Sequence, residues 1–457
     1  MKISNASISI LTSLVITSNI FADAAQQLRG HRGVVENGQW EAAPFMETGP
    51  FGLDSTHTFG FSLQGKAYAM TGNLRVPEFD YCGDCRGTDI SVPSKFTDVY
   101  YSYDPTTGWT DLGPHPGGVR GYSQGDIMDR GTDNEILYWG LGAGRRIEDE
   151  HGDLRPIYPQ WGFGGENRTE YGLQENRTGT LRLTDWWSFD GTDWKRLAEF
   201  PGIGRTHPAV AASDGKVFVG LGFGELCPSL ADPCTATSYQ SDPRGAAGNL
   251  QDVWVYDVQT DTWEEVEPFP YPDHHPMHFG LSGHNDQDPG GAFFMAGHNG
   301  AIVYNRVWKI VEQTSPDGKY NFTWTEMAPL PGLGRVAGTQ FSHKGYGYVL
   351  GGETAANGNN LLDGFGNSGD YGLNVSALKE DHRSMSSNEF WKYSSQSNTW
   401  TQLPSTPDDG SRWAGSSFVL DDYVYCFQGV TRKGHYQFNN FTQIWPQQGY
   451  RMYIGGD

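Results

Sequence analysis

The sequence has few cysteines and few basic residues, and beyond its N-terminus it has no long apolar run. Lysine and arginine number 32 against 54 aspartates and glutamates, which leaves a formal net charge of −22. This acidity, with no basic run to offset it, argues against nucleic acid and against anionic membrane surfaces as partners. After the N-terminal segment no stretch approaches the roughly 18 apolar residues of a membrane span, so no membrane insertion is expected.

Sequence signatures of zinc sites are also missing. The chain has no His-Glu-x-x-His, the motif of many zinc-dependent proteases. The close cysteine pairs lack the two further ligands that a zinc site at matching spacing requires. The sequence therefore predicts no cofactor and no metal.

Residues 1–24 are predicted to be a secretory signal peptide, and residues 25–457 to be one mature domain. Lys2 supplies the positive charge, residues 8–20 form an apolar stretch, and Ala22-Asp23-Ala24 is a small-x-small cleavage site. The alternative is an uncleaved anchor. We expect a secreted, extracellular or periplasmic protein. Five mature Asn-x-Ser/Thr sequons are predicted glycosylation sites: Asn167, Asn176, Asn321, Asn374 and Asn440.

What the sequence has in abundance is a repeat. Six times a polar residue precedes a hydrophobic pair that ends in an aromatic side chain. These runs begin at Asp98, Asp185, Asp252, Arg306, Glu389 and Gln443. Five of them are followed by a second tryptophan and then by proline, at Trp109, Trp194, Trp263, Trp324 and Trp400. Such a pattern means one supersecondary unit used many times.

Each unit also has an upstream half, a β-branched and aromatic run that ends in glycine, as in 345–352. The unit is therefore four short strands: a small-residue strand, a glycine-ended strand, the aromatic-pair strand and the tryptophan strand. The sixth unit lacks its tryptophan strand, and Trp40 with Pro44 matches the missing piece. We predict a ring of six blades whose last blade is closed by the N-terminal strand, which protects the sheet edges. The C-terminal stretch 450–457 is the second candidate for that place.

This pattern resembles the kelch family of β-propellers over nearly all of the mature chain. The resemblance implies an all-β fold, a six-bladed kelch-type β-propeller. Two features depart from the family: the repeats are longer than the usual unit of about 50 residues, and two glycine pairs are imperfect.

A site is predicted at the start of the innermost strands, around the central channel. Aligning these strands places Ser55 in the first blade and basic residues in the other five, namely Arg120, Arg205, His275, Arg335 and Arg412. Guanidinium groups bind carboxylates and sulfates bidentately, so we expect a cationic mouth for an anion or a sugar acid. The alternative is that each arginine holds carbonyl groups of neighbouring loops.

Long loops between the second and third strands lie on the same face in five blades, and they are rich in aromatic residues and glycine. Loops of this length in a compact fold are usually functional or disordered, and this composition suits a binding wall. Glu225 and Glu353 begin two of them. They are weak candidates for catalytic acid–base groups, with an ion-pair role as the more favoured alternative.

The first functional hypothesis is a binding module for a glycan, an anionic small molecule or an extracellular protein on this loop-walled face. The second is a cofactor-free sugar isomerase or another carbohydrate-active enzyme at the same mouth, because the architecture is similar to that of the bacterial sialic-acid mutarotase. A copper oxidoreductase similar to galactose oxidase ranks last. Its ligand set of Tyr, His and cysteine-linked Tyr cannot be mapped onto this sequence, and the Glu-x3-Asp-x3-His spacing of the iron-using plant specifier proteins is absent.

The cysteines provide a test. Cys82 with Cys85, and Cys227 with Cys234, are close pairs within loop segments and should form local disulfides in an oxidising compartment. Cys426 stands alone in a glycine-ended strand and should be a buried free thiol. Non-reducing peptide mapping should find both bonds, with Cys426 slow to react with alkylating reagents in the native protein. A Cys82–Cys234 bond, or rapid alkylation of Cys426, would contradict this assignment.

Overall fold

The structure is a computed structural model of the 457-residue chain. It describes residues 38–47, 55–75, 94–144, 181–224, 249–285, 288–299, 302–313, 321–332, 334–354, 386–407, 410, 412–435, 440–446 and 448–455.

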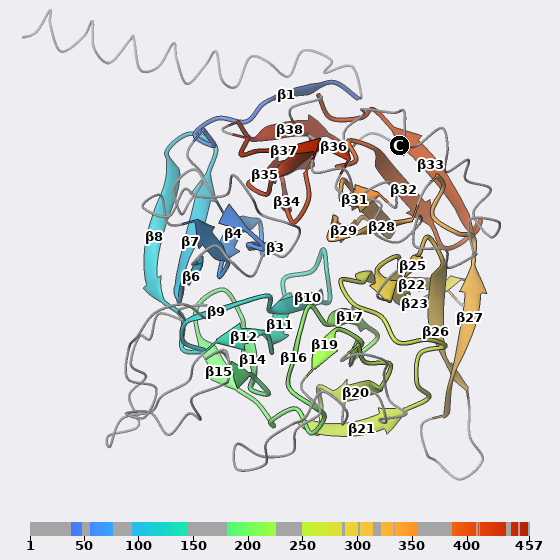
Figure 1. Ribbon diagram of the computed structural model, residues 1–457. Helices are drawn as coiled ribbons and strands as arrows, with labels where there is room; N and C mark the ends of the chain where they lie inside the picture. The colour runs from blue at the N-terminus through green and yellow to red at the C-terminus, as the bar shows by residue number, and fades with distance from the viewer. Residues whose placement is uncertain are drawn as a thin grey trace, which may run out of the picture.

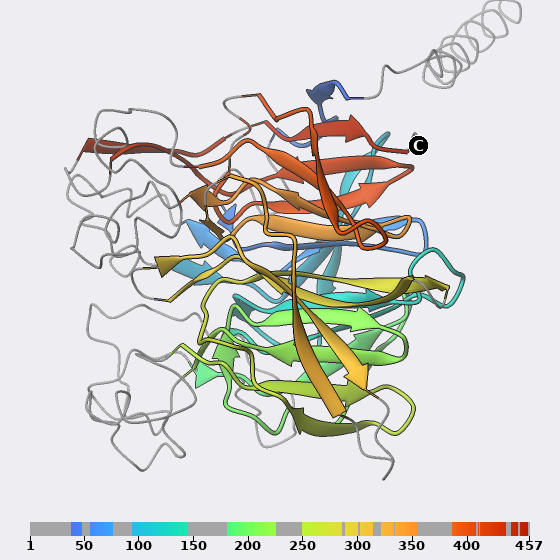
Figure 2. The same ribbon diagram turned by 90° about the vertical axis from the view of Figure 1, so that its right-hand side faces the viewer.

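Six four-stranded antiparallel sheets surround a central axis as the blades of a propeller, which confirms the predicted all-β fold (Figures 1 and 2). In every blade the first strand is innermost and the next two follow outward in chain order. Blade 1 is β3 (Phe59–Leu63), β4 (Lys66–Met70), β7 (Val99–Asp104) and β8 (Gly108–Pro114). Blade 2 is β10 (Gln124–Met128), β11 (Ile136–Gly140), β14 (Trp186–Phe189) and β15 (Trp194–Arg196). Blade 3 is β17 (Ala209–Ser213), β18 (Lys216–Gly220), β20 (Val253–Asp257) and β21 (Thr262–Val266).

The other three blades follow the same plan. Blade 4 is β22 (Met277–Asn285), β23 (Asp288–Met295), β26 (Val307–Gln313) and β27 (Asn321–Met327). Blade 5 is β29 (Thr339–His343), β30 (Tyr346–Leu350), β32 (Phe390–Ser394) and β33 (Thr399–Leu403). Blade 6 is β34 (Ser416–Leu420), β35 (Tyr423–Phe427), β38 (Tyr450–Tyr453) and, outermost, β1 (Trp40–Ala42).

Two-residue turns join the first and second strands of several blades. In blade 3 the turn is Asp214-Gly215, with φ values of 51° and 76°, and in blade 6 it is Asp421-Asp422, with φ values of 50° and 63°. Two successive residues with positive φ make the type I′ turn, whose twist matches that of paired strands. The turn chemistry therefore fixes the register of the inner hairpins.

The hydrophobic core is divided among the joints between blades. Six of the buried clusters each combine side chains from two neighbouring blades, as where Val210 and Val219 of blade 3 pack with Trp186 of blade 2. The repeated tryptophans reinforce these joints in four places. Each donates its Nε1–H to a carbonyl oxygen of the preceding blade: Trp263 to Ala198, Trp324 to Glu267, Trp400 to Ala328 and Trp40 to Pro404.

Closure by the N-terminal strand is confirmed. β1 pairs antiparallel with β38, with Trp40 opposite Met452, and the Trp40 Nε1–H donates to Pro404 at 2.7 Å as the other three tryptophans do in their blades. Ala43 and Met46, just after β1, are 1% and 3% exposed in the cluster shared with blade 1. The C-terminal stretch does not compete for this place, because it forms the third strand.

The predicted third strand of blade 6 was wrong. Gln443-Ile444-Trp445 lies at the end of a separate hairpin, β36 (Thr431–His435) with β37 (Asn440–Ile444), and β38 takes the place beside β35. The burial of the side chains explains the choice. Met452 of β38 is 1% exposed between two blades, whereas Ile444 is 45% exposed.

Short ladders continue the inner strands beyond the blades. Examples are β2 (Ser55–Thr56) with β5 (Asn73–Arg75), and β16 (Arg205–Thr206) with β19 (Phe223–Gly224). One residue with positive φ, between 50° and 61°, separates each ladder or bridge from the blade below it. We call these six residues the axial ring: His57, Tyr122, His207, His275, Ala337 and Ala414. Hydrogen bonds join three neighbouring pairs of their backbones: the amides of His57, His207 and Ala414 donate to the carbonyls of Ala414, Tyr122 and Ala337, at 2.9 Å, 3.0 Å and 2.8 Å.

Some of the remaining sequence predictions concern described residues, and others do not. Cys426 is a buried free thiol, as predicted. The signal segment 1–24 and eight other predicted positions lie outside the described residues: Cys82, Cys85, Cys227, Cys234, Glu225 and the sequon residues Asn167, Asn176 and Asn374. The sequon residues Asn321 and Asn440 begin β27 and β37. Within the described ranges, no helix has the length and apolar character needed to cross a bilayer.

The closure of blade 6 is testable by truncation. Deleting residues 25–46 removes β1, unpairs the edge of β38 and exposes the apolar joint with blade 1, so we expect loss of cooperative melting or aggregation. The matched control is a chain that starts at residue 38 and keeps β1. Thermal unfolding followed by circular dichroism compares the two. A truncated protein that melts as the control does would show that β1 is dispensable for closure.

Candidate functional site

The four predicted arginines lie in register at the start of the inner strands, but their side chains are buried. Arg120, Arg205 and Arg335 are 0% exposed, and Arg412 is 3% exposed. Three of them form ion pairs with the polar residue that leads the aromatic pair of the same blade. These pairs are Arg120–Asp185 at 2.6 Å, Arg205–Asp252 at 2.6 Å and Arg335–Glu389 at 2.5 Å.

Each of these carboxylates also accepts a hydrogen bond from the tryptophan two residues later. The Trp254 Nε1–H, for example, donates to Asp252 at 2.9 Å, and the other blades repeat this with Trp187 and Trp391. The guanidinium groups also donate to backbone carbonyls. For example, Nη1 of Arg412 donates to the carbonyl oxygen of Gln428 at 2.6 Å. These contacts agree with the alternative given for the arginines, in which each one holds neighbouring segments of the chain. A role of the arginines in ligand binding stays a prediction.

Blade 4 departs from this arrangement, and its register differs from the one predicted. In four junctions between blades, a glycine amide just after the second strand donates to the backbone carbonyl of the residue at the arginine position of the next blade, as Gly142 does to Arg205 and Gly297 to Arg335. At the junction of blades 3 and 4 the amide of Gly222 donates to the backbone carbonyl of Asp273 at 2.9 Å. Asp273 therefore takes the arginine position, and His275 lies two residues further on. The sequence alignment failed because it took Leu281 of the long strand β22 as the equivalent of Phe61, whereas Phe279 lies four residues after His275 as Phe61 lies four residues after His57.

Five histidines gather at the axis as a result. His57, His207 and His275 of the axial ring come from three blades, and one ring nitrogen from each lies within 4.8 Å of the others. His274 and His298 extend the group, with His274 Nε2 3.1 Å from His207 Nδ1 and His298 Nε2 3.2 Å from His275 Nδ1. We call these five residues the histidine cluster. Burial and the neighbouring imidazoles lower the pKa of His275 well below its ordinary value, so its ring is neutral at neutral pH.

Asp273 lies directly beside this cluster and is 0% exposed. Its Oδ1 accepts the backbone amide of His274 at 2.8 Å, and Oδ2 has no hydrogen-bond partner among the described residues. Burial raises the pKa of the carboxyl well above its ordinary value, against the opposing effect of the amides of His274 and His298. A buried carboxyl without a cationic partner is costly unless it is protonated.

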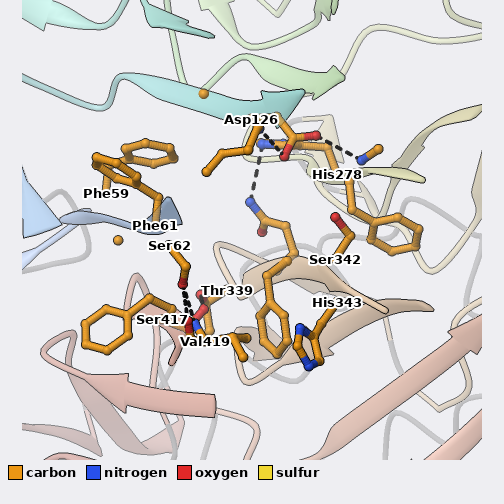
Figure 3. A pocket seen from close by; sticks show the side chains of 18 of the residues that line it. Phe59, Phe61, Ser62, Asp126, His278, Thr339, Ser342, His343, Ser417 and Val419 are labelled. Carbon is orange, nitrogen blue, oxygen red and sulfur yellow. Dashed lines mark hydrogen bonds between the residues drawn. The ribbon is translucent and has the colours of Figure 1, made fainter. Parts of the chain in front are cut away.

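A cavity of about 800 Å³ follows the axis from the ring histidines to the hairpins between the first and second strands (Figure 3). Phe59 and Phe61 lie together on one side, with ring centroids 5.5 Å apart and planes inclined by 24°. Many polar groups in the wall bridge blades. The Asp126 carboxylate accepts the amides of Ala212 at 2.8 Å and Gly280 at 3.0 Å, so it joins three blades.

Of the two predicted acid–base candidates, the structure places Glu353. Glu353 is 1% exposed and lies in β31 (Glu353–Thr354), where it pairs with Val336. It does not line the cavity. Glu225 lies outside the described residues. Sequence reasoning missed four members of the histidine cluster: His57, His207, His274 and His298. The sequence offered one signal for them: His207 lies two residues after Arg205, and His57 two residues after Ser55. The misalignment of blade 4 hid this signal, because it placed His275 at the arginine position.

Comparisons with known proteins give a fold-level likeness. No protein-family model matches the chain, and no curated protein matches it. Among solved structures, one described as "Structure of YjhT" is 14% identical, covers 87% of this chain and 99% of its own, and has a TM-score of 0.48.

The arginine pairs generate a stability prediction. Asp252→Asn should lower the free energy of unfolding by about 3–5 kcal/mol, because it leaves a buried guanidinium without its counter-charge. Burial raises the pKa of Asp252, but Arg205 and Trp254 more than offset this and hold it below 3.8. The contribution is thus full above that pH and is lost as the pH falls through the lowered value. Urea unfolding at pH 7 and at acid pH measures both effects.

The control is Glu199→Gln, which breaks the exposed Arg196–Glu199 pair, with side chains 42% and 56% exposed. It should change stability by less than about 1 kcal/mol. Arg205→Ala tests the cationic mouth directly. A variant of Arg205 that folds with unchanged stability but loses affinity for an anionic ligand would contradict the structural role.

Proposed function

We propose that this protein is a binding module that acts outside the cytosol and takes a neutral sugar of a glycan into the axial cavity. The observation that carries the proposal is the wall of that cavity, which has aromatic rings on one side and hydroxyl and amide groups elsewhere. The lysine and the arginine in this wall are paired with carboxylates. The predicted signal peptide supports the location, and the propeller fold is compatible with carbohydrate binding.

The size and chemistry of the cavity suit such a ligand. Its volume of about 800 Å³ lies within the range of about 300–1,000 Å³ that is typical of small-molecule sites. The ring of Phe59 is half-buried at the wall, and the polar groups elsewhere in the wall include Gln340 and Ser342. Sugar rings place their C–H faces on aromatic rings and their hydroxyls on amides and hydroxyls, a mixture that this wall offers.

The charges favour a neutral ligand over an anion. The cavity is lined by two basic side chains apart from histidine, Arg130 and Lys344. Both form ion pairs: Nη2 of Arg130 lies 2.6 Å from Oδ1 of Asp126, and Nζ of Lys344 lies 2.8 Å from Oδ2 of Asp422. An anion would have to displace these carboxylates, and the arginines of the inner strands are likewise engaged. An anionic small molecule or an extracellular protein remains a weaker proposal for the loop-walled face.

A second candidate is a cofactor-free sugar isomerase at the same place. The observation in its favour is the imidazole of His275 in the wall of the cavity, since an imidazole beside a bound sugar can take up and return a proton. Saturation-exchange NMR of sugar anomers, with and without the protein, separates this candidate from simple binding.

Binding is tested by isothermal titration of the purified chain with a panel of neutral mono- and disaccharides. Phe59→Leu keeps most of the apolar volume but removes the ring, so it should weaken the binding of a responding sugar by about tenfold, the value of one aromatic stacking contact. The matched control is Phe45→Leu, a ring that is 47% exposed and outside the cavity. Failure of every neutral sugar to bind, or equal weakening by both variants, would remove the support for this site.

A further inference from the structure

We propose that His57, His207 and His275 form a binding site for one divalent transition-metal ion at the axis of the propeller. The sequence alone predicts no metal, because these residues lie far apart along the chain and the ring closure of the fold brings them together. The metal site lies at one end of the cavity of the sugar proposal, but its test does not depend on that proposal, since it measures metal binding and uses variants of the histidines rather than of Phe59.

The geometry of the three rings supports coordination through Nε2. Each Nδ1 has a hydrogen-bond partner: Thr56 Oγ1 at 3.2 Å from His57, His274 Nε2 at 3.1 Å from His207, and His298 Nε2 at 3.2 Å from His275. A neutral imidazole that donates from Nδ1 presents the lone pair of Nε2. Metal-binding histidines almost always have their second nitrogen held in this way, which fixes the ring orientation.

The axial ring shows that the fold itself does not require these histidines. The six positions share the same backbone conformation, with φ near 50–61°, yet blades 5 and 6 carry Ala337 and Ala414 there. The imidazoles are therefore additions to a position where alanine suffices. The two alanines also keep that part of the ring small, which leaves room for an ion and for a further ligand of its coordination sphere.

The surroundings of the trio support the same site. Tyr122 and Trp413 pack edge-on against His57, with ring centroids 4.7 Å and 4.9 Å away, which limits the movement of that imidazole. Asp273, with its buried and unpartnered Oδ2, accepts the amide of His274 and so supports the 273–275 segment. Such supporting contacts around the ligands are the usual setting of a metal site.

The donor set indicates which ions fit. Three neutral imidazoles suit Zn²⁺, Cu²⁺ and Ni²⁺, whereas Mg²⁺ and Ca²⁺ require oxygen ligands. Three protein ligands leave an open coordination position, as in sites where the metal also holds water or a ligand oxygen. The cavity below is lined by the same three histidines, so that position is accessible from it.

The test uses the full chain after treatment with EDTA. Equilibrium dialysis against Zn²⁺ followed by elemental analysis should find one ion per chain, and titration calorimetry should give a dissociation constant of micromolar or below. Mg²⁺ and Ca²⁺ should give no comparable signal. Co²⁺ loading should add visible d–d absorption, a direct sign of coordination that non-specific association does not produce.

His57→Ala is the decisive variant, because the second possible trio, His274 with His275 and His298, does not include it. The substitution places at blade 1 the residue that blades 5 and 6 already carry, so the protein should fold. We expect Zn²⁺ affinity to fall at least tenfold in His57→Ala, His207→Ala and His275→Ala. His343→Ala, at the other end of the cavity, is the matched control and should bind as the parent does.

Two results would overturn the proposal. One is the absence of stoichiometric Zn²⁺ binding by the parent chain. The other is unchanged binding by a folded His57→Ala variant, which would move any metal to the second trio or to the surface. Neither result bears on sugar binding, which is measured without metal and with different variants.

Discussion

No blade of this protein buries its apolar faces alone. The six main hydrophobic clusters are each shared by two neighbouring sheets, so every blade depends on the presence of the next and the ring must close. This explains why the outer strand of the last blade comes from the opposite end of the chain. It also explains why Trp40 bonds to blade 5 in the same manner as the tryptophans of three other blades.

The same dependence accounts for the buried charges. Strands that converge at the axis leave backbone carbonyls and amides near one another in an enclosed region, and such groups need partners. Arg205 satisfies the Leu221 carbonyl and pairs with Asp252, and two other blades repeat the arrangement. Blade 4 replaces the arginine with Asp273, which lacks a cationic partner among the described residues. The departure from the repeat coincides with the histidine cluster, as expected where a functional site overrides structural consistency.

The axial ring shows how the fold supplies a site without specifying its chemistry. Six equivalent residues meet at the axis, held by left-handed backbone conformations and by hydrogen bonds between blades. The six positions share one backbone conformation although their side chains differ: three are histidines, one is tyrosine and two are alanines. Both proposals, a sugar in the cavity and a metal at its end, use this convergence.

The sequence by itself determined the blade number, the order of strands in the first five blades and the closure by Trp40, because these follow from local periodicity and from a repeated tryptophan–proline pattern. It also predicted that Cys426 is buried. Only the tertiary structure decided that three of the four arginines face carboxylates, that β38 displaces Gln443-Ile444-Trp445, and that Asp273 rather than His275 continues the arginine register. The physical reason is that register within a strand, and the direction of a long side chain, depend on partners tens of residues away along the chain, as Asp185 is from Arg120. The histidine cluster exists only because the ring closes.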